Sequence, residues 1–541
     1  MGANSAYDVY TTETDLSQRV AAASTSIGAL VGESAMGPVG EKTLVTDTTE
    51  FAKIFGKRDP RYGWAAYAAN FFLQESNQLY FTRLVNGALT AGVYLTVDDP
   101  LASVPNLVLS NFDDGGNTPL GIEDPLNNLG FTPTTPGVEN ILLYFCCANP
   151  GVWNNRVSIR VAPTNPAGVP VGQDHNVFHF RVEVYLDYNG PGDVPVEAFV
   201  CSRSYEVDGE GNQLFVEDVI NDGSNYIRVK NNPYCDAVEV RDTAFEFLAG
   251  ATDGARVTES QMVEAWEAYA ETDELTVNIL ISGGYTQPSI QTKINEIAVR
   301  RGDSFAFLDV PSNKQDVSSA ITYRRNDLNI NSSYSGLYLP DIQIYDEDSN
   351  RKLYVPISGY AAALAARTDA NFGVQYAFAG LKRGNMRILG TRHTYGQGAR
   401  DALDPAQINP VRKINDPTGY FLWGNMTQQS FASAFSDVNV RRVFNFIKAS
   451  ARAACRSGLF DPNDEFLRSF LTRIVTDFLK PLVQDRSLYD FEVVCDERNN
   501  TNATIATGDL IMDIYADPVR AAKRIHITAN LSATGAKFFE N

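Results

Sequence analysis

LTVNILISGGYTQPSIQTKINEIAVRRGDSFAFLDVP, residues 275–311, alternates apolar runs with a helical pattern. VNILISGG and SFAFLDVP have the composition of buried strands, and SIQTKINEIAVRRG between them has the pattern of a helix. The helical pattern SQMVEAWEAYA precedes this stretch at 260–270. Strands and helices that alternate in this way predict an α/β layer.

The same alternation of strand and helix patterns is present near the amino terminus. Residues 1–20 are polar and predict an extended arm, and residues 21–95 predict the first part of the α/β core. Within this part we expect strands at 26–31 and 43–45, a helix that ends near Gly56, a helix at 64–74 and a strand at 78–85. Thr48 or Thr49 is the expected N-cap of the first helix.

Residues 96–250 differ from both flanks. They are rich in Asn, Asp, Gly and Pro, and they contain the short strand patterns NILLYFCC, RVSIRVA and VFHFRVEVYLDY. The segment has 22 acidic residues against seven Lys and Arg, a net charge of −15 in a chain whose total is −20. We therefore expect an acidic, mostly β domain inserted into the core.

The core resumes at 251–515 and is followed by an expected C-terminal arm at 516–541. In RIHITANLSATG, residues 524–535, the residues Ile525, Ile527, Ala529 and Leu531 alternate with polar residues, which is the pattern of a half-buried strand. Asp517 and Pro518 precede it as a strand break. This strand is expected to pair either inside its own domain or with another chain.

Composition excludes several classes of protein. At 541 residues the chain is long enough for several domains. No apolar run approaches the roughly 18 residues of a membrane span, and the start lacks the pattern of a secretory signal. Six cysteines without a C-x-x-C pair predict synthesis in a reducing cytoplasm. The net charge of −20 argues against a nucleic-acid partner.

Motifs of catalysis are weak. In GPVGEKT, residues 37–43, Glu41 separates the glycine from the lysine and Pro38 removes a donor, so we expect a turn and not a nucleotide site. His175 and His179 lie in a strand pattern, no G-x-S-x-G is present, and RGD at 301–303 fits a helix-end turn. The sequence predicts no catalytic, cofactor or metal residue, and hence no enzyme.

One helix pattern, DVNVRRVFNFIKASARAACRSG, opens on an acidic cap at Asp437 and closes at Gly458. Its basic residues fall on one face, separate from its apolar stripe: Arg441, Lys448, Arg452 and Arg456. This face is either simply solvated or an electrostatic docking surface for an acidic partner.

Taken together, several segments resemble the contractile tail sheath family. They are DLSQRVAAASTSIGALVGESAMGPVGEKTLVTDTTEFAKIFG, FLAGATDG with VNILISGG and FAFLDVP, LYVPISGYAAALAARTDANFGVQYAFAG, INPVRKI, and VVCDERNNT followed by GDLIMDIYADPVRAAKRIHITANLSATGAKF. Their order and spacing are specific, although each motif alone is weak. AYDVY at 6–10 departs from the Pro-Gly-Val-Tyr type of turn with which family arms often begin.

The resemblance implies a multidomain fold of mixed α+β and α/β type, with terminal arms that add strands to neighbouring subunits. The donated residues would be Tyr7, Val9 and Tyr10 in the N-terminal arm, and Arg524, Ile525, His526, Ile527, Thr528, Ala529, Asn530 and Leu531 in the C-terminal arm. Leu510, Met512 and Ile514 would belong to a receiving strand, and the basic helix face would contact an inner tube.

The resemblance also implies a function. Such subunits form stacked hexameric rings around an inner tail tube, bind baseplate and tail terminator proteins, and contract without nucleotide hydrolysis. They are virion components, made and assembled in the host bacterial cytoplasm, and need no cofactor, nucleic acid or membrane insertion. The alternatives are another self-assembling protein, such as a capsid or surface-layer subunit, and an enzyme whose site the sequence does not reveal.

Overall fold

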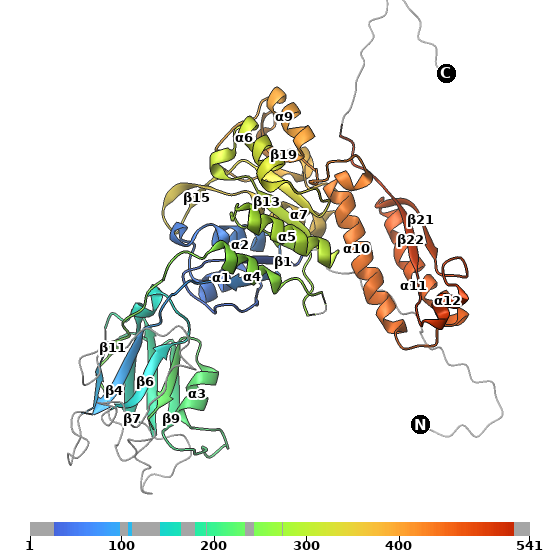
Figure 1. Ribbon diagram of the computed structural model, residues 1–541. Helices are drawn as coiled ribbons and strands as arrows, with labels where there is room; N and C mark the ends of the chain where they lie inside the picture. Colours follow the sequence, from blue (N-terminus) through green and yellow to red (C-terminus); the bar gives the residue numbers. More distant parts are fainter. Residues whose placement is uncertain are drawn as a thin grey trace, which may run out of the picture.

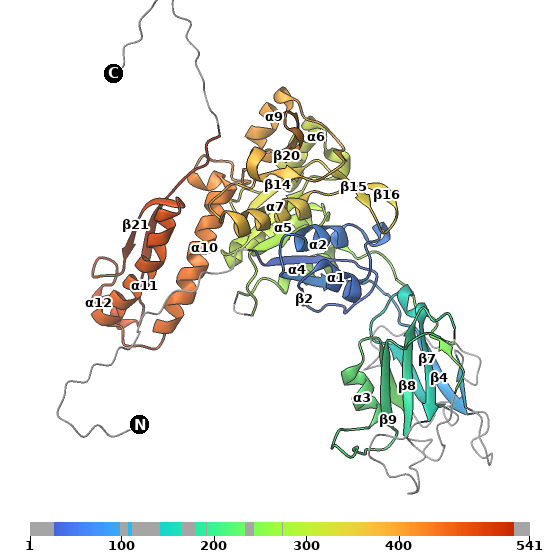
Figure 2. The same cartoon turned by 180° about the vertical axis from the view of Figure 1, so that it is seen from behind.

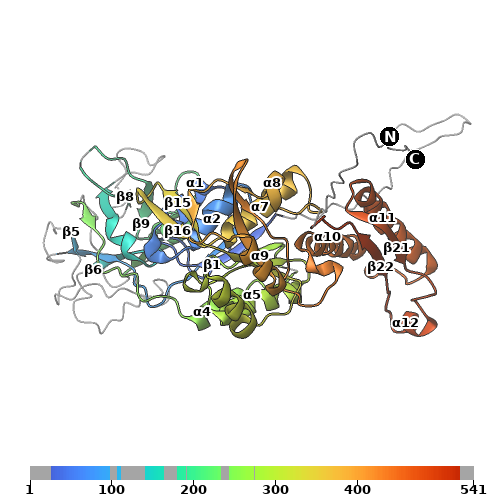
Figure 3. The same cartoon turned by 90° about the horizontal axis from the view of Figure 1, so that it is seen from above.

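The computed structural model describes residues 26–97, 107–110, 141–163, 179–190, 192–232, 243–272 and 274–523. These residues form three bodies in a row (Figures 1 and 3): a β-rich body, a central α/β body and a C-terminal module of helices with a small sheet. The expected donated residues at 7–10 and 524–531 lie outside the described residues.

The central body is built on a nine-stranded sheet with the order β17-β20-β19-β14-β13-β12-β1-β3-β2. Six neighbouring strands, from β19 to β3, are parallel, and the strands at both margins are antiparallel. The bounds are β1 Gly28–Gly32, β2 Thr43–Val45, β3 Leu79–Arg83, β12 Ile279–Ile281, β13 Phe305–Asp309, β14 Ser335–Leu339, β17 Asn385–Met386, β19 Ile408–Asn415 and β20 Thr418–Leu422.

Helices cover both faces of this sheet, and the strands are accordingly apolar on both sides. Ile279 and Ile281 pack on one face with α1, α2 and α7, whereas Leu280 between them packs on the other face with α4 and α5. Figure 2 shows the first group of helices in front of the sheet. The bounds are α1 Thr48–Phe55, α2 Ala65–Leu73, α4 Glu259–Glu267, α5 Pro288–Arg301, α6 Val317–Thr322, α7 Ser358–Asn371, α8 Gly380–Arg383 and α9 Gln397–Leu403.

The first helix is capped by a residue other than the expected one. The Asp47 carboxylate accepts hydrogen bonds from the backbone amides of Thr49 and Glu50 at 2.7 and 2.8 Å. Thr48 is already the first helical residue, so the prediction of a Thr48 or Thr49 cap is wrong. A carboxylate at this position also favours the positive end of the helix dipole.

The β-rich body consists of two antiparallel four-stranded sheets with the orders β10-β6-β4-β5 and β11-β7-β8-β9. Apolar side chains from both sheets and from α3 meet in one core cluster. The bounds are β4 Gly92–Val97, β5 Leu107–Ser110, β6 Ile141–Cys147, β7 Val157–Pro163, β8 His179–Leu186, β9 Glu197–Ser202, α3 Val216–Gly223, β10 Ile227–Asn231 and β11 Glu246–Phe247. Strand β4 thus runs across the domain boundary expected at 95/96.

Two chain segments that run side by side connect this body to the core. Leu89 exchanges backbone hydrogen bonds with Thr252, and Gly92 does so with Ala249. Arg83 at the end of β3 is 1% exposed and donates to the backbone carbonyls of Ser34, Gly37 and Pro150. The last of these carbonyls belongs to the β-rich body, so a core strand holds the neck in place.

The C-terminal module packs two long helices against a hairpin-like sheet. Its elements are α10 Val438–Cys455, α11 Glu465–Gln484, β21 Leu488–Val494, α12 Asn502–Ala506 and β22 Asp513–Pro518. A separate three-stranded sheet, β16-β15-β18, flanks the core with β15 Ile342–Asp346, β16 Arg351–Val355 and β18 Gly390–Thr391. Among the described residues, no helix combines the length and the apolarity that crossing a bilayer requires.

Candidate functional site

The C-terminal module contains a sheet of only two strands. β21 and β22 pair antiparallel from Leu488 opposite Pro518 to Val494 opposite Asp513, and among the described residues neither strand has another partner. A two-stranded ribbon is marginal by itself and has open edges on both sides. Here α11 supports one face of the ribbon.

The side chains of β22 divide between that supported face and solvent. Ile514 and Ala516 pack against the apolar cluster of α10 and α11, together with Met512 just before the strand. Tyr515 on the opposite face is 60% exposed. The strand therefore has a half-buried face that fixes its register and, within the described part of the chain, one edge without a neighbouring strand.

A groove of about 620 Å³ lies along this strand. One wall is formed by Ala434 and Phe435, which precede α10, and by Phe444 within α10. The other wall is formed by Asp490 to Glu492 of β21 and Ile514 to Pro518 of β22. Figure 1 shows β22 beside α10. The combination of an apolar wall on the α10 side and a strand edge without a described neighbour suits an extended peptide segment.

The residues of the expected receiving strand lie only partly in β22. Ile514 is in β22 and Met512 lies on the same face, but Leu510 precedes the strand by three residues. The reason is the side chain of Asn500, whose amide binds both the backbone N–H and the C=O of Ile511 at 2.8 Å. The strand therefore begins at Asp513.

The basic face of α10 is only partly exposed. Arg441 is 8% exposed, and its guanidinium lies over the rings of Phe435 and Tyr334, 3.7 and 4.3 Å from their centroids. Lys448 is half-buried and donates to the Tyr334 hydroxyl at 2.7 Å. Arg452 and Arg456 are exposed. The prediction of four surface cations is wrong for Arg441, which packs between aromatic rings from outside its own helix.

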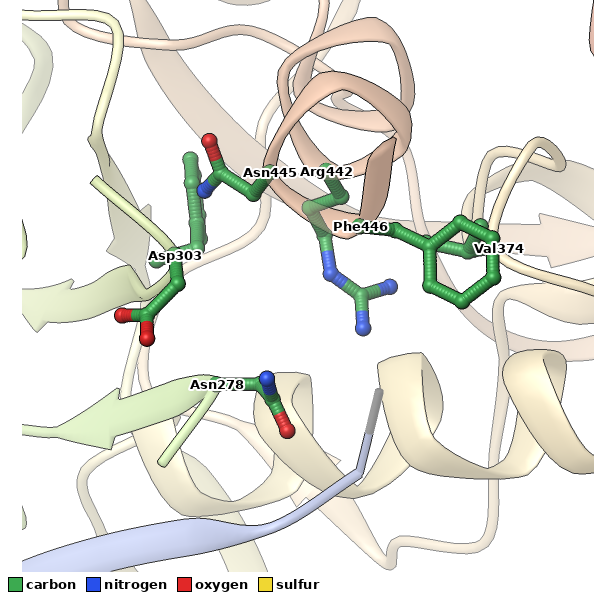
Figure 4. A pocket seen from close by; sticks show the side chains of 7 residues that line it. Asn278, Asp303, Val374, Arg442, Asn445 and Phe446 are labelled. Carbon is green, nitrogen blue, oxygen red and sulfur yellow. The ribbon is translucent and has the colours of Figure 1, made fainter. Parts of the chain in front are cut away.

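Buried polar groups on the core-facing side of α10 join this helix to the core. Arg442 donates to both carboxylate oxygens of Asp369 at 2.9 and 2.5 Å, and the two side chains are 4% and 2% exposed. Figure 4 shows Arg442 pointing into a small cavity bounded also by Asn278, Asp303 and Asn445. At about 10 Å³ this cavity is at the lower limit for one water molecule, so it is a packing defect of the interface and too small for a ligand.

The carboxyl edge of a parallel sheet is where α/β proteins bind ligands. Here Asp309, the last residue of β13, is buried and accepts hydrogen bonds from Ser282 Oγ, Gly284 N and Ser358 N at 2.8, 3.1 and 2.8 Å. Burial raises the pKa of this carboxyl, against the lowering effect of those hydrogen bonds. The carboxylate thus holds the start of α7 against the loop after β12.

The other motifs are also used inside the fold. Arg301 and Asp303 of the RGD sequence are buried and bound to each other, and Gly302 ends α5 in the left-handed conformation, which confirms the helix-end turn. Lys42 of GPVGEKT donates to the Ala268 carbonyl at 3.2 Å and pairs with Glu274 at 3.1 Å. His179 lies 2.6 Å from Glu206. Among the described residues, no three His, Cys, Asp or Glu side chains are grouped to hold a metal ion.

Comparison with known protein families identifies the family of this chain. A model described as phage tail sheath protein central domain matches residues 255–428, and one described as phage tail sheath C-terminal domain matches residues 431–532. The chain belongs to the contractile tail sheath family. The C-terminal match of this sheath-family chain includes α10, the groove and β22, whereas neither match extends over the β-rich body at 92–249.

Individual relatives agree. The sheath-family chain is 28% identical to the tail sheath protein of Enterobacteria phage T4 over 312 residues, which are 54% of this chain and 47% of the relative. It is 27% identical to that of Vibrio phage KVP40 over 372 residues, 64% of this chain and 54% of the relative. The chain thus spans about half the length of these curated relatives.

Solved structures share the fold over nearly the whole chain. A sheath tail protein from Listeria innocua superposes with a TM-score of 0.57 at 11% identity, covering 93% of this chain and 97% of that one. The contracted helical sheath of the anti-feeding prophage gives a TM-score of 0.53 at 14% identity, covering 98% and 99%. The sheath-family fold therefore includes mixed helices and several sheets in a multidomain arrangement.

Sequence reasoning missed two parts of this region. It did not predict that Phe435 and Phe444 form a groove wall, because only the fold brings them opposite β22. It treated Asp437 as a helix cap, although its side chain makes no capping hydrogen bond. The available signal was the pair of basic residues Arg520 and Lys523, which bind Asp437.

Proposed function

We propose that this chain is a structural subunit of a contractile tail sheath and that it polymerises by strand addition at the groove beside β22. The observation that carries the proposal is a strand edge open within the described residues and flanked by an apolar wall from α10. In strand addition, main-chain hydrogen bonds provide affinity and pockets for alternate side chains provide specificity. Family membership supports this reading.

The incoming segments in this proposal are the terminal arms of other copies. The C-terminal arm would contribute the alternating residues 525, 527, 529 and 531, and the N-terminal arm residues 7, 9 and 10. In a linked array of this kind subunits can move relative to one another while the donated strands keep them connected. We propose that the array consists of hexameric rings around an inner tube and that it contracts without nucleotide hydrolysis.

Removing the C-terminal arm tests this proposal. A variant that lacks residues 524–541 should fold, because the described core, ribbon and groove precede that segment. It should form no tubes, whereas the full chain should form long striated tubes in electron micrographs. Tubes from the truncated chain would contradict strand donation. Shells or flat lattices from the full chain would favour a capsid or surface-layer protein instead.

A second variant tests the groove itself. Ala434→Trp adds a large side chain to the groove wall without touching the β21–β22 ladder, and it should abolish tube formation. Ala432→Trp is the matched control, because Ala432 is exposed two residues away and does not line the groove. Equal tube yields from both variants, measured by pelleting and microscopy, would place the incoming strand elsewhere.

We also propose that the exposed end of the basic helix face contacts an acidic inner tube. The candidates are Arg452 and Arg456, because Arg441 is buried and Lys448 is half-buried against the Tyr334 hydroxyl. Arg452→Glu with Arg456→Glu should still polymerise but fail to load on tubes. Arg473→Glu, an exposed cation on the neighbouring helix α11, is the control. Normal loading of the double variant would refute the contact.

Further partners follow from the same proposal. A sheath subunit of this kind would bind baseplate and tail terminator proteins at the two ends of the array and would be a component of the virion. It would be assembled in the host bacterial cytoplasm. Copurification of baseplate proteins with assembled tubes, and their absence from the 524–541 deletion, would test these contacts.

A further inference from the structure

One buried carboxylate in the C-terminal module holds the last described residues of the chain. Asp437 is fully buried immediately before α10. Its Oδ2 accepts from Arg520 Nε at 2.9 Å, and its Oδ1 lies 2.5 Å from Lys523 Nζ. The two cations are about half exposed, so the pair of contacts fixes a surface segment to a buried point.

The same segment is fixed at its beginning by the backbone. The Val519 amide donates to the Ser487 carbonyl at 3.1 Å, just after β22 ends at Pro518. Residues 519–523 are therefore held at three points, by Ser487 and by both oxygens of Asp437. Lys523 is the last described residue and directly precedes the predicted donated strand.

The contacts of Asp437 with Arg520 and Lys523, which we call the anchor, lie next to the groove in the sequence. Ala434 and Phe435 line the groove, and Asp437 follows Phe435 by two residues. On the other wall Pro518 lines the groove, and Arg520 follows it by two residues. The contacts that hold residues 519–523 and the groove that would receive a neighbour's strand are thus built on the same two short segments.

We propose that Asp437 is a positioning residue for the C-terminal arm, a role that rests on the proposed strand donation. By holding Arg520 and Lys523, it fixes the point from which the arm leaves, beside the mouth of the receiving groove. A segment that is already held in place loses less conformational freedom on binding, so less of the interaction energy is spent on ordering it. The anchor should therefore lower the concentration at which tubes form.

Trypsin tests the anchor without requiring assembly. Asp437→Asn removes the charge but retains the cleavage sites after Arg520 and Lys523. In the unassembled chain it should accelerate cleavage at these bonds roughly tenfold, as expected when local opening becomes about 1.4 kcal/mol easier. Asp485→Asn, an exposed aspartate of the same module, should leave the rate unchanged. Arg520→Lys, which retains both charge and cleavage site, should stay close to the wild type.

A second variant covers the case in which Asp437→Asn does not fold. Lys523→Gln leaves Arg520 on the buried carboxylate, so the module should remain intact. Cleavage after Arg520 should then accelerate by a smaller factor. If neither folded variant is cleaved faster than the wild type, the anchor is overturned.

Assembly tests the positioning role. Asp437→Asn should raise the critical concentration of tube formation roughly tenfold, measured by pelleting. An unchanged critical concentration, with faster cleavage, would overturn positioning and leave strand donation intact. If the wild-type chain formed no tubes at all, the proposed function would fail, while the cleavage assay would still decide whether Asp437 anchors the segment.

Discussion

Arg301 joins the end of α5 to the chain that follows α4. Its guanidinium is buried and donates to the carbonyls of Tyr269, Glu271 and Leu275 at 2.9, 2.7 and 2.8 Å, while Asp303 supplies the counter-charge. Only arginine has enough donors in a fixed plane to satisfy this set. The residue is therefore a structural cross-link of the core.

Arg301→Lys should lower the free energy of unfolding of the core by about 3 kcal/mol, because at least two buried acceptors lose their charged donor. Arg300→Lys is the matched control. Arg300 is exposed, and its partners Glu267 and Glu271 are surface carboxylates, so its loss should cost less than about 0.5 kcal/mol. Thermal unfolding of the unassembled chain measures both, and similar losses would contradict the cross-link.

At the scale of single residues, sequence patterns located apolar positions better than they identified the contact partners of charged side chains. The helical period placed Arg441 on the basic face, but it could not include Tyr334, which is more than 100 positions away in the sequence. The same limit applies to Asp437, whose cations lie more than 80 positions later. A pattern read along one element does not contain the side chains that another element brings to it.

At the scale of elements, α10 rests on the core through a buried ion pair. Arg442 and Asp369 are held in a bidentate arrangement that satisfies both groups, and Asn445 adds a hydrogen bond to the Ser304 carbonyl at 2.8 Å. Breaking one partner of such a pair leaves an uncompensated buried charge. The ion pair and the Asn445 hydrogen bond therefore fix one register of α10 on the core.

A double-mutant cycle should reveal this coupling. Arg442→Met alone should destabilise the protein by about 3–5 kcal/mol, and the double variant with Asp369→Leu should lose clearly less than the sum of the two single variants. The exposed pair Lys480 and Asp477 on α11 is the control, with an expected coupling below about 0.5 kcal/mol. Additive losses at 442 and 369, measured by denaturant unfolding, would show that the pair is not coupled.

Several elements could be predicted because their signals are local. β2 lies at 43–45 as expected, and the three strand patterns of the acidic segment correspond to β6, β7 and β8. The start of β22 could not be predicted, because Asn500 takes both backbone groups of Ile511. The apolar alternation continues through 510–512, but the hydrogen bonds there belong to a side chain.

At the scale of the whole molecule, the acidic β-rich body and the C-terminal module lie at opposite ends of the core (Figure 3). The order of the central sheet that separates them was beyond sequence reasoning. β1 pairs with β12, about 250 residues later, and such pairing depends on long crossovers. We have proposed that strand edges of the C-terminal module join copies of the chain. We propose in addition that the acidic body, at the other end of the core, faces outward.

Tubes should then repel one another through a surface of net negative charge. They should stay dispersed at low salt and associate side by side as salt is raised, because the Debye length falls from about 30 Å at 0.01 M to about 3 Å at 1 M. Light scattering and microscopy measure this. A variant in which a short linker replaces residues 92–249 should already bundle at low salt. Dispersed tubes from that variant would show that the body does not keep tubes apart.

The neck between core and β-rich body has a consequence for how such chains can vary. Its two segments are hydrogen-bonded neighbours at Leu89 and Thr252, so the chain enters and leaves the β-rich body at two closely spaced points, and Arg83 of the core adds a hydrogen bond to the Pro150 carbonyl beyond them. A foreign domain whose own termini lie close together could be fused there without altering the order of the nine strands. The neck is therefore a suitable fusion site for displaying a foreign domain on an assembled tube. Exchange of the outer body during evolution would use the same site.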